Sequence, residues 1–308
     1  PQVPTEQHET VRLMRQLIRA QDLSMIDRES GNVRCCLTSM QIPGLFAARL
    51  PHAAPYLLRI RWPQGEQVTE DAYSFGLLLG EMDLYLLGEG NHRQLGHCLG
   101  AQPMTVEGVE GVRFAVWAPN AQRVSVVGNF NSWDGRRHVM RLRIAAGVWE
   151  LFIPRLGPGE AYKYEIIEAS GTIGLRADPV ALATEVPPST ASVVADTTPF
   201  TWHDDAWIAQ REKAHAPSQP ISIYEVHLGS WQRAEHNRYL SYTELADKLV
   251  GYVIEMGFTH LQLMPISEYP FDGSWGYQPV GLFAPTSRFG DYNSFKYLIQ
   301  QCHKANIG

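Results

Sequence analysis

The segment from Phe271 to Pro279 restricts the possible fold and function of this chain more than any other stretch. It follows the apolar run 261–264 and precedes an amphipathic helix, so it is predicted to be a long loop after a β-strand. In α/β barrels such loops form the active site. Glycines flank an aromatic pair here, so the backbone can turn sharply while flat apolar faces point outward. Such a surface suits a sugar ring with Asp272 and Gln278 as polar neighbours; the alternative is a buried loop that anchors two helices.

The region 220–308 alternates strands and helices, which predicts two successive strand–helix units. Strands are expected at 221–226 and 259–264. Ser241 and Glu244 match a capping box at a helix start, and Asp291 is expected to cap the second helix. The inward stripe of the first helix is predicted to consist of Leu245, Leu249, Val253 and Met256.

The middle of the chain has a different pattern, with short runs in which apolar and polar residues alternate. These runs lie at 112–116, 124–126, 149–153 and 162–166, and turn residues separate them. Period-two alternation of this kind predicts an immunoglobulin-like β-sandwich. The predicted fold is therefore multidomain: one or more all-β sandwich modules, followed by an α/β body of two strand–helix units.

Several long motifs carry a resemblance to a known family: 114–121, 127–138, 224–231, 257–260 and 271–279. In this order they resemble the bacterial glycogen branching enzymes of the α-amylase superfamily, and the likeness runs from about Gly44 to Gly308. The resemblance implies a partial N-terminal β-sandwich and connector at 42–103 and a glycogen-binding sandwich at 104–197. It further implies a linker with some helical content at 198–219 and the start of an α/β (β/α)8 TIM barrel, with two of its eight units, at 220–308. Residues 1–41 are left as an unassigned leader.

The reaction implied by this resemblance is the cleavage of an α-1,4 glucan and the transfer of the released chain to a 6-hydroxyl. It runs through a covalent glycosyl-enzyme with retention, and it needs neither cofactor nor metal. In the superfamily the catalytic carboxylates lie on the fourth and fifth barrel strands, so they are expected beyond Gly308. The chain is accordingly expected to be an N-terminal fragment that is inactive alone.

The substrate contacts implied by the resemblance lie in the aromatic loop. Tyr277 resembles the superfamily tyrosine that stacks on the sugar ring where the covalent intermediate forms. Trp275, Asp272 and Gln278 are expected to shape this loop or a neighbouring subsite. Glu225 and His227, which end the first strand, are expected to bond within the barrel mouth rather than to act as catalysts.

A second possible glucan contact lies on the sandwich. The match at 131–134 carries over one tryptophan of related glycogen-binding modules, Trp133. The partner aromatic residue expected about 40 residues later falls at 170–173, which hold no aromatic side chain. Trp133 is therefore either a glucan contact or a core or interdomain residue, and Lys163 is a weaker candidate.

Composition sets the expectations for partners and location. The formal charge is −6 and no long Lys/Arg run occurs, which argues against nucleic acid and is compatible with a neutral α-1,4-glucan or glycogen. No apolar run reaches the ~20 residues that a membrane span needs, and no signal peptide is recognisable. Cys35, Cys36, Cys98 and Cys302 have no metal-binding spacing and are expected to be reduced and mostly buried. We expect a cytoplasmic monomer.

Two other functions remain open. Maltooligosyltrehalose trehalohydrolases share the order of sandwich and barrel, but their first strand normally lacks the Leu-Gly-Ser-Trp sequence found here at 228–231. An enzyme of that kind would release trehalose, whereas a branching enzyme would change iodine absorbance. A non-catalytic glucan-binding protein is the other alternative, and the unpaired strand edges of a quarter barrel argue against it. The coding sequence beyond Gly308 would decide between the enzyme and this non-catalytic alternative. The sequence does not specify the length of the transferred chain.

Overall fold

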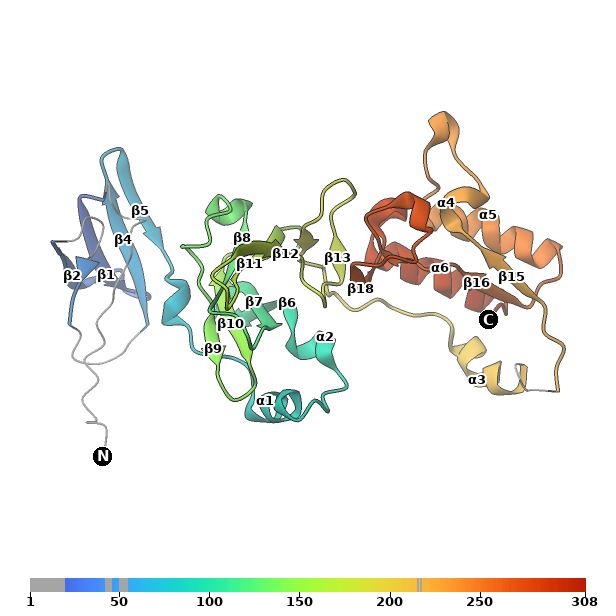
Figure 1. Ribbon diagram of the computed structural model, residues 1–308, viewed down its shortest axis with the longest axis horizontal. Coiled ribbons are helices and arrows are strands. Elements are labelled where there is room, and N and C mark those ends of the chain that lie inside the picture. The colour runs from blue at the N-terminus through green and yellow to red at the C-terminus, as the bar shows by residue number, and fades with distance from the viewer. Residues whose placement is uncertain (1–19, 42–45, 50–54, 215, 217) are drawn as a thin grey trace.

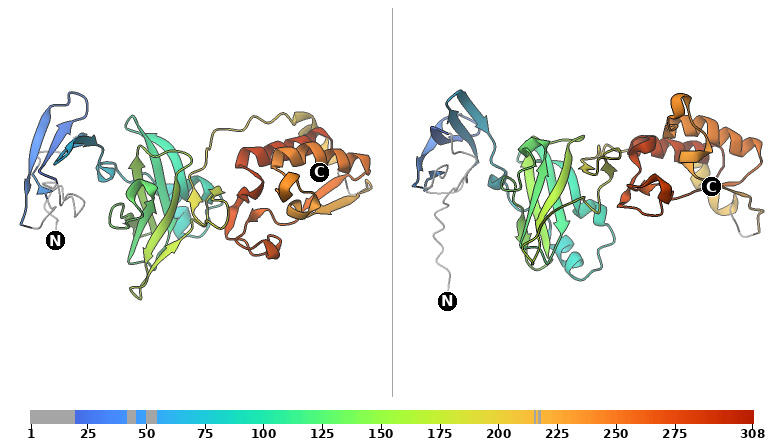
Figure 2. Two further views of the ribbon diagram at one scale, coloured as in Figure 1. Left: turned by 90° about the horizontal axis from the view of Figure 1, so that it is seen from above. Right: turned by 45° about the horizontal axis from the view of Figure 1, so that its top comes forward.

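A computed structural model of the protein describes residues 20–41, 46–49, 55–214, 216 and 218–308. Three bodies follow one another along the long axis of the molecule: an N-terminal sheet, a β-sandwich and a C-terminal α/β body (Figures 1 and 2). Residues 1–19, which make up the first half of the leader expected at 1–41, lie outside the described residues. None of the described helices is both long enough and apolar enough to cross a bilayer.

The N-terminal body is one antiparallel sheet in the order β3-β2-β1-β4-β5. Its strands are β1 (Asp22–Asp27), β2 (Val33–Ser39), β3 (Phe46–Ala47), β4 (Tyr56–Trp62) and β5 (Gly65–Thr69). The predicted boundary at residue 41 is wrong, because β1 and β2 precede it and β1 pairs with β4 over its whole length. The sequence did not reveal this because the pairing joins residues 29 to 39 positions apart, and no local pattern specifies it.

The middle body is a sandwich of two sheets. One sheet has the order β6-β7-β10-β9, and in the other β11 pairs with β8, β12 and β14, while β13 pairs with β14. The strands are β6 (Gly100–Val106), β7 (Val109–Trp117), β8 (Arg123–Gly128), β9 (Arg141–Arg143), β10 (Val148–Pro154), β11 (Ala161–Ile167), β12 (Ile173–Arg176), β13 (Ala183–Thr184) and β14 (Ser192–Val193). Two short helices, α1 (Glu81–Gly88) and α2 (Leu95–Cys98), connect the first sheet to the sandwich.

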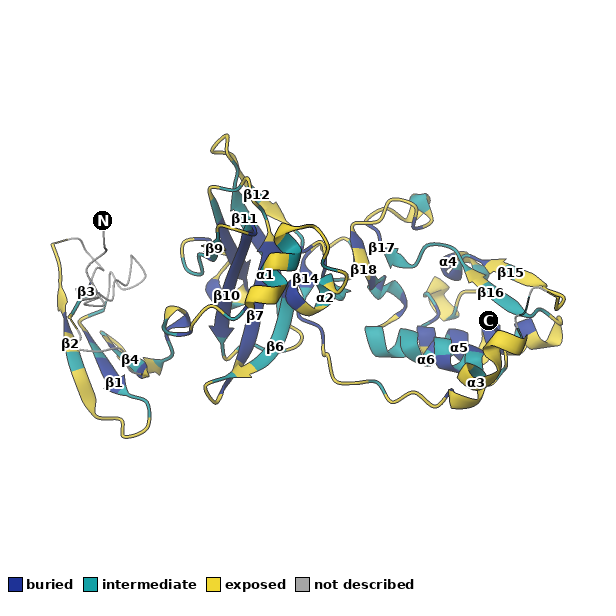
Figure 3. Ribbon diagram, turned by 90° about the horizontal axis from the view of Figure 1, so that it is seen from below, coloured by how far each residue is buried: buried dark blue, intermediate teal, exposed yellow. Residues whose placement is uncertain are grey.

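The period-two runs account for the sandwich core. All four predicted runs lie in strands, namely β7, β8, β10 and β11, and their apolar side chains are buried between the sheets (Figure 3). The predicted boundary at 104 falls inside β6, which pairs with β7 from Gly100 onward. That strand lacks clear alternation and is only half-buried along most of its length, so its pattern gave no signal.

The C-terminal body contains two successive strand–helix units. Strands β15 (Ile223–Val226) and β16 (His260–Leu263) pair in parallel, and helices α5 (Tyr242–Glu255) and α6 (Tyr292–Lys304) pack on each other. The Ser241/Glu244 capping box and the Asp291 cap are both present, as predicted. The predicted stripe of α5 is buried at Leu245, Leu249 and Val253, whereas Met256 is 56% exposed because it lies at the cap, beyond the last turn. Closure of these units into a barrel stays a prediction.

The segment 198–219 is less linker-like than expected. It contains α3 (Asp205–Ala214), which is held against α6. The Trp207 ring stacks on the His303 ring at 3.8 Å, and Asp204 Oδ2 lies 2.6 Å from His303 Nδ1. This segment is thus docked on the C-terminal body through contacts that join residues about 100 positions apart.

The four cysteines differ in exposure. Cys98 and Cys302 are buried, Cys35 is half-buried and Cys36 is exposed. The expectation that the thiols are mostly buried therefore holds for two of them only. Burial raises the pKa of the Cys302 thiol to about 11, so this thiol is protonated at neutral pH and unreactive.

Candidate functional site

The predicted substrate loop is the connection between two short antiparallel strands after β16. These strands are β17 (Ser267–Glu268) and β18 (Gly281–Pro285), and Glu268 faces Gly281 at the base of the loop. The Val280 amide donates to the Glu268 carbonyl oxygen at 2.8 Å, which closes the loop. The segment from Tyr269 to Val280 is therefore a hairpin connection fixed at its two ends.

Both aromatic residues of this loop are presented to solvent. Trp275 is 58% exposed and Tyr277 is 64% exposed, so the alternative of a buried anchoring loop is wrong. Trp275 has a left-handed backbone with φ of 54°, and Gly276 follows with φ of 89°. A side chain at Gly276 would collide with the Pro265 carbonyl oxygen, so only glycine permits this turn. The backbone itself thus directs the two rings outward.

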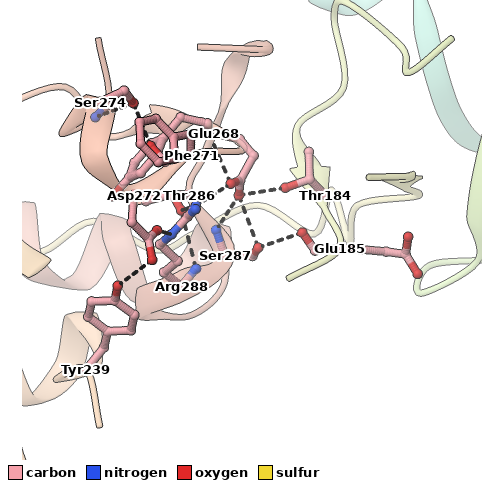
Figure 4. A network of polar contacts seen from close by, with 12 residues as sticks. Thr184, Glu185, Tyr239, Glu268, Phe271, Asp272, Ser274, Thr286, Ser287 and Arg288 are labelled. Carbon is pink, nitrogen blue, oxygen red and sulfur yellow. Dashed lines mark hydrogen bonds and ion pairs between the residues drawn. The ribbon is translucent and has the colours of Figure 1, made fainter. Parts of the chain in front are cut away.

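A buried ion pair lies directly beneath the loop (Figure 4). Arg288 Nη1 donates to Glu268 Oε1 at 2.7 Å, and the two side chains are 4% and 5% exposed. The Arg288 guanidinium also lies 3.9 Å from the centre of the Tyr269 ring. A buried ion pair is tolerated only where further hydrogen bonds satisfy both groups. Sequence analysis missed both residues: Glu268 precedes the aromatic loop and Arg288 follows β18, and no local pattern connects them.

Asp272 connects this ion pair to the loop. Its Oδ1 accepts from Arg288 Nε at 2.8 Å, and its Oδ2 accepts from the Tyr239 hydroxyl at 3.2 Å. The side chain nevertheless remains 65% exposed. Asp272 begins the short helical turn Asp272–Ser274, which ends at Trp275. The carboxylate therefore holds the start of the turn from which the aromatic residues project. Gln278 is exposed farther along the same loop.

The two residues at the end of β15 are engaged locally. Glu225 Oε2 accepts from Gln262 Nε2 on the neighbouring strand at 2.9 Å. His227 Nδ1 lies 2.9 Å from Ser230 Oγ, and its ring centre lies 6.3 Å from that of Trp275. Burial lowers the pKa of His227, and the positive charge of Arg233 adds to this effect. His227 is therefore a neutral side chain beside the aromatic loop at neutral pH.

Trp133 and Lys163 lie near one end of the sandwich. The Trp133 amide donates to the Gly128 carbonyl oxygen at 2.9 Å, and Gly128 pairs with Tyr162, the neighbour of Lys163. The Trp133 indole donates to Asn129 Oδ1 at 2.9 Å while the residue stays 36% exposed. Lys163 Nζ donates to Thr190 Oγ1 at 2.7 Å. Trp133 is therefore not part of the sandwich core.

Within the ranges that the structure describes, no group of three or more His, Cys, Asp or Glu side chains is placed to hold a metal ion. The polar network below the loop is instead made of paired charges and hydroxyl groups. The geometry of this network is suited to holding the aromatic loop 271–279 in one position.

Comparison with known proteins gives this geometry a family context. Residues 98–181 match the model of carbohydrate-binding module 48, the isoamylase N-terminal domain. Among solved structures, a Salmonella typhimurium protein described as an alpha amylase superimposes with a TM-score of 0.53 and 25% identity, covering 68% of this chain and 32% of that protein.

Curated relatives match almost the whole chain. The 1,4-alpha-glucan branching enzyme GlgB of Pseudomonas syringae pv. syringae is 55% identical over 94% of this chain, and that of Pseudomonas fluorescens is 57% identical over 94%. GlgB 2 of Rhizobium johnstonii is 56% identical over the same share. The chain spans about 40% of the length of each of these relatives. Over nearly its whole length, the chain is thus similar to the amino-terminal part of the 1,4-alpha-glucan branching enzymes GlgB, and its residues 98–181 match carbohydrate-binding module 48.

Proposed function

We propose that this chain supplies the amino-terminal part of a 1,4-alpha-glucan branching enzyme that acts on α-1,4-glucan in glycogen synthesis. The observation that carries the proposal is the identity of 55–57% to such enzymes over 94% of the chain. The exposed pair Trp275 and Tyr277 supports it, because two outward aromatic faces on one rigid loop suit a sugar ring. We assign this protein to the cytoplasm, as a monomer.

In this proposal the chain's own residues bind and orient the polymer. Tyr277 stacks on the sugar ring at which the glycosyl-enzyme forms, and Trp275 and Gln278 border the neighbouring subsite. The aromatic faces exclude water, which matters because branching is a transfer and not a hydrolysis. Asp272 acts on the loop, through Arg288 and Tyr239, as well as on the sugar. No carboxylate of this chain is assigned the role of nucleophile or acid/base.

The C-terminal body is proposed to be the first quarter of a (β/α)8 barrel, with β15 and β16 as its first two strands. The parallel pairing of these strands and the helix that follows each one support this assignment. The aromatic loop follows the carboxyl end of β16, which is the end where barrel enzymes place their active sites. The sandwich before it is proposed to hold glucan, with Trp133 as its contact.

The experiment compares the chain 1–308 with a complete branching enzyme that contains it. Both proteins are incubated with amylose, and iodine absorbance and the 1H signals of α-1,6 linkages are followed. We expect the complete enzyme to form α-1,6 linkages. The chain alone should form no α-1,6 linkages, but glucan in the gel should slow its migration in affinity electrophoresis. Release of trehalose, or of reducing ends without new branches, by the complete protein would contradict the proposal. Branching by the isolated chain would contradict the assignment of the catalytic carboxylates elsewhere.

A further inference from the structure

Glu268 accepts hydrogen bonds from two different bodies of the molecule. Its Oε2 accepts from Thr184 Oγ1 at 2.9 Å, and Thr184 lies in β13 at the edge of the sandwich. The same oxygen accepts from the Ser287 amide at 2.9 Å, and Oε1 accepts from Arg288 Nη1 at 2.7 Å. Ser287 Oγ lies 3.0 Å from the Glu185 carbonyl oxygen, also on the sandwich side. Figure 4 shows Thr184 and Glu185 facing this network from the sandwich.

The network continues without a break into the aromatic loop. Arg288 binds Glu268 through Nη1 and Asp272 through Nε, so one rigid guanidinium fixes the relative position of the two carboxylates. Asp272 starts the turn that ends at Trp275, and the Tyr277 amide donates to the Ser274 carbonyl oxygen at 3.0 Å. Two side chains therefore separate the sandwich hydroxyl of Thr184 from the loop that bears the aromatic pair.

We infer that Glu268 and Arg288 are positioning residues through which the sandwich edge at Thr184 fixes the conformation of the 271–277 loop. The edge of the sandwich thereby takes part in building the sugar subsite. Only the statement that this loop contacts glucan rests on the proposed function; the coupling of the sandwich to the loop does not.

Physical chemistry favours a positioning role over a purely stabilising one. A buried ion pair adds little net stability, because the desolvation of both charges offsets their attraction. A planar guanidinium between two carboxylates instead imposes direction, since each N–H must meet its acceptor. The network lies at the base of the hairpin, where Glu268 faces Gly281, so a small shift there moves the whole loop.

The test removes the Thr184 contact and leaves the contact of Ser287 with the Glu185 carbonyl oxygen in place. Thr184→Val in the chain 1–308 deletes the hydroxyl at nearly constant volume and leaves Arg288, Ser287 and the loop sequence intact. Because a hydrogen bond to a charged group is lost, amides of 271–280 should exchange with deuterium roughly 5- to 30-fold faster. Thr184→Ser restores a hydroxyl and should restore slow exchange. The matched control is Thr190→Val, which removes a hydroxyl from the β13–β14 connection that binds Lys163 instead. It should leave the loop unchanged.

The same variants, made in a complete branching enzyme, test the effect of this contact on activity. Thr184→Val should lower kcat/KM on amylose roughly 5- to 30-fold, with rescue by Thr184→Ser and no comparable loss in Thr190→Val. Equal loop exchange in Thr184→Val and Thr190→Val would overturn the coupling. Faster exchange without any loss of kcat/KM would overturn the part of the inference that concerns the subsite. An unimpaired Tyr277→Ala enzyme would instead contradict the proposed function and leave the exchange result standing.

Discussion

The buried guanidinium of Arg288 donates a 2.8 Å hydrogen bond from Nε to Oδ1 of the exposed Asp272. The pair joins the start of the aromatic loop to the segment that follows β18. Asp272 therefore serves the shape of the loop even though most of its surface faces solvent. Asp272, which was expected to shape this loop or a neighbouring subsite, is thus part of the framework beneath the aromatic pair.

Replacing Asp272 should destabilise the C-terminal body. In Asp272→Ala the Nε of the buried Arg288 loses its acceptor, so we expect a loss of about 1 kcal/mol in the free energy of unfolding. Asp272→Asn keeps an oxygen acceptor and should lose less. Urea unfolding followed by near-ultraviolet circular dichroism measures both. Asp247→Ala, an exposed site on α5, is the control, and an equal effect of the two alanine variants would contradict the prediction.

Tyr277 should contribute to catalysis through the face of its ring. In a complete enzyme Tyr277→Ala should lose roughly 1–3 kcal/mol of transition-state stabilisation, or about a 5- to 150-fold drop in kcat/KM. Tyr277→Phe keeps the ring and should lose much less. Steady-state kinetics on amylose distinguishes the two variants. A phenylalanine variant as weak as the alanine variant would show that the hydroxyl, rather than stacking, is responsible.

Trp133 should bind glucan on the sandwich. Trp133→Ala removes an exposed indole face, and the loss of one aromatic contact should weaken binding of maltoheptaose about 10-fold. Lys163→Met should have a smaller effect, because Lys163 is already bonded to Thr190. Isothermal titration of the chain 1–308 gives the affinities. Trp117→Ala is the matched control, since Trp117 is a 59% exposed tryptophan on the other sheet of the sandwich. Equal losses in both tryptophan variants would remove the special role of Trp133.

His138 should make the stability of the sandwich depend on pH. Burial, with the adjacent charge of Arg137, lowers the pKa of His138 to about 4. Above about pH 6.5 the imidazole is neutral in both the folded and unfolded states, so it adds no pH dependence there. As the pH falls from 6.5 toward 4, only the unfolded state gains the proton, and stability is lost.

The expected size of this effect follows from the two pKa values. Between pH 7.5 and pH 5 the native protein should lose about 2 kcal/mol more unfolding free energy than His138→Gln. Urea titrations read out through NMR amide signals of β10 report on the sandwich separately. His236→Gln, at an exposed histidine of the C-terminal body, should behave like the native protein. Parallel pH profiles for His138→Gln and the native protein would contradict the prediction.

The sandwich and the C-terminal body should differ when each is expressed alone. Residues 98–197 contain both sheets with a shared core and should unfold cooperatively. Residues 220–308 expose apolar side chains, among them Ile221 at 56% and Leu282 at 66%, and should aggregate or remain poorly ordered. Solubility, near-ultraviolet circular dichroism and thermal melting compare them. A monomeric 220–308 piece with a cooperative melt would contradict the prediction that it belongs to a larger barrel.

The sequence by itself determined those features that repeat over a few residues. The alternation in 112–116 and 162–166 specified strands, because every second side chain must reach the core between two sheets. Ser241 with Glu244 specified a helix start, because their side chains satisfy free backbone amides within the same turn. The glycines around Trp275 likewise indicated an outward aromatic loop, since the required backbone angles are local.

Only the tertiary structure decided which distant segments meet. The pairing of β1 with β4, the docking of Trp207 on His303, and the contact of Thr184 with Glu268 each join residues that no local pattern connects. Thr184 and Glu268 lie 84 positions apart, and each is an ordinary polar residue in its own segment. They become hydrogen-bond partners because the fold brings the sandwich edge against the buried Glu268, whose carboxylate needs donors where water is excluded.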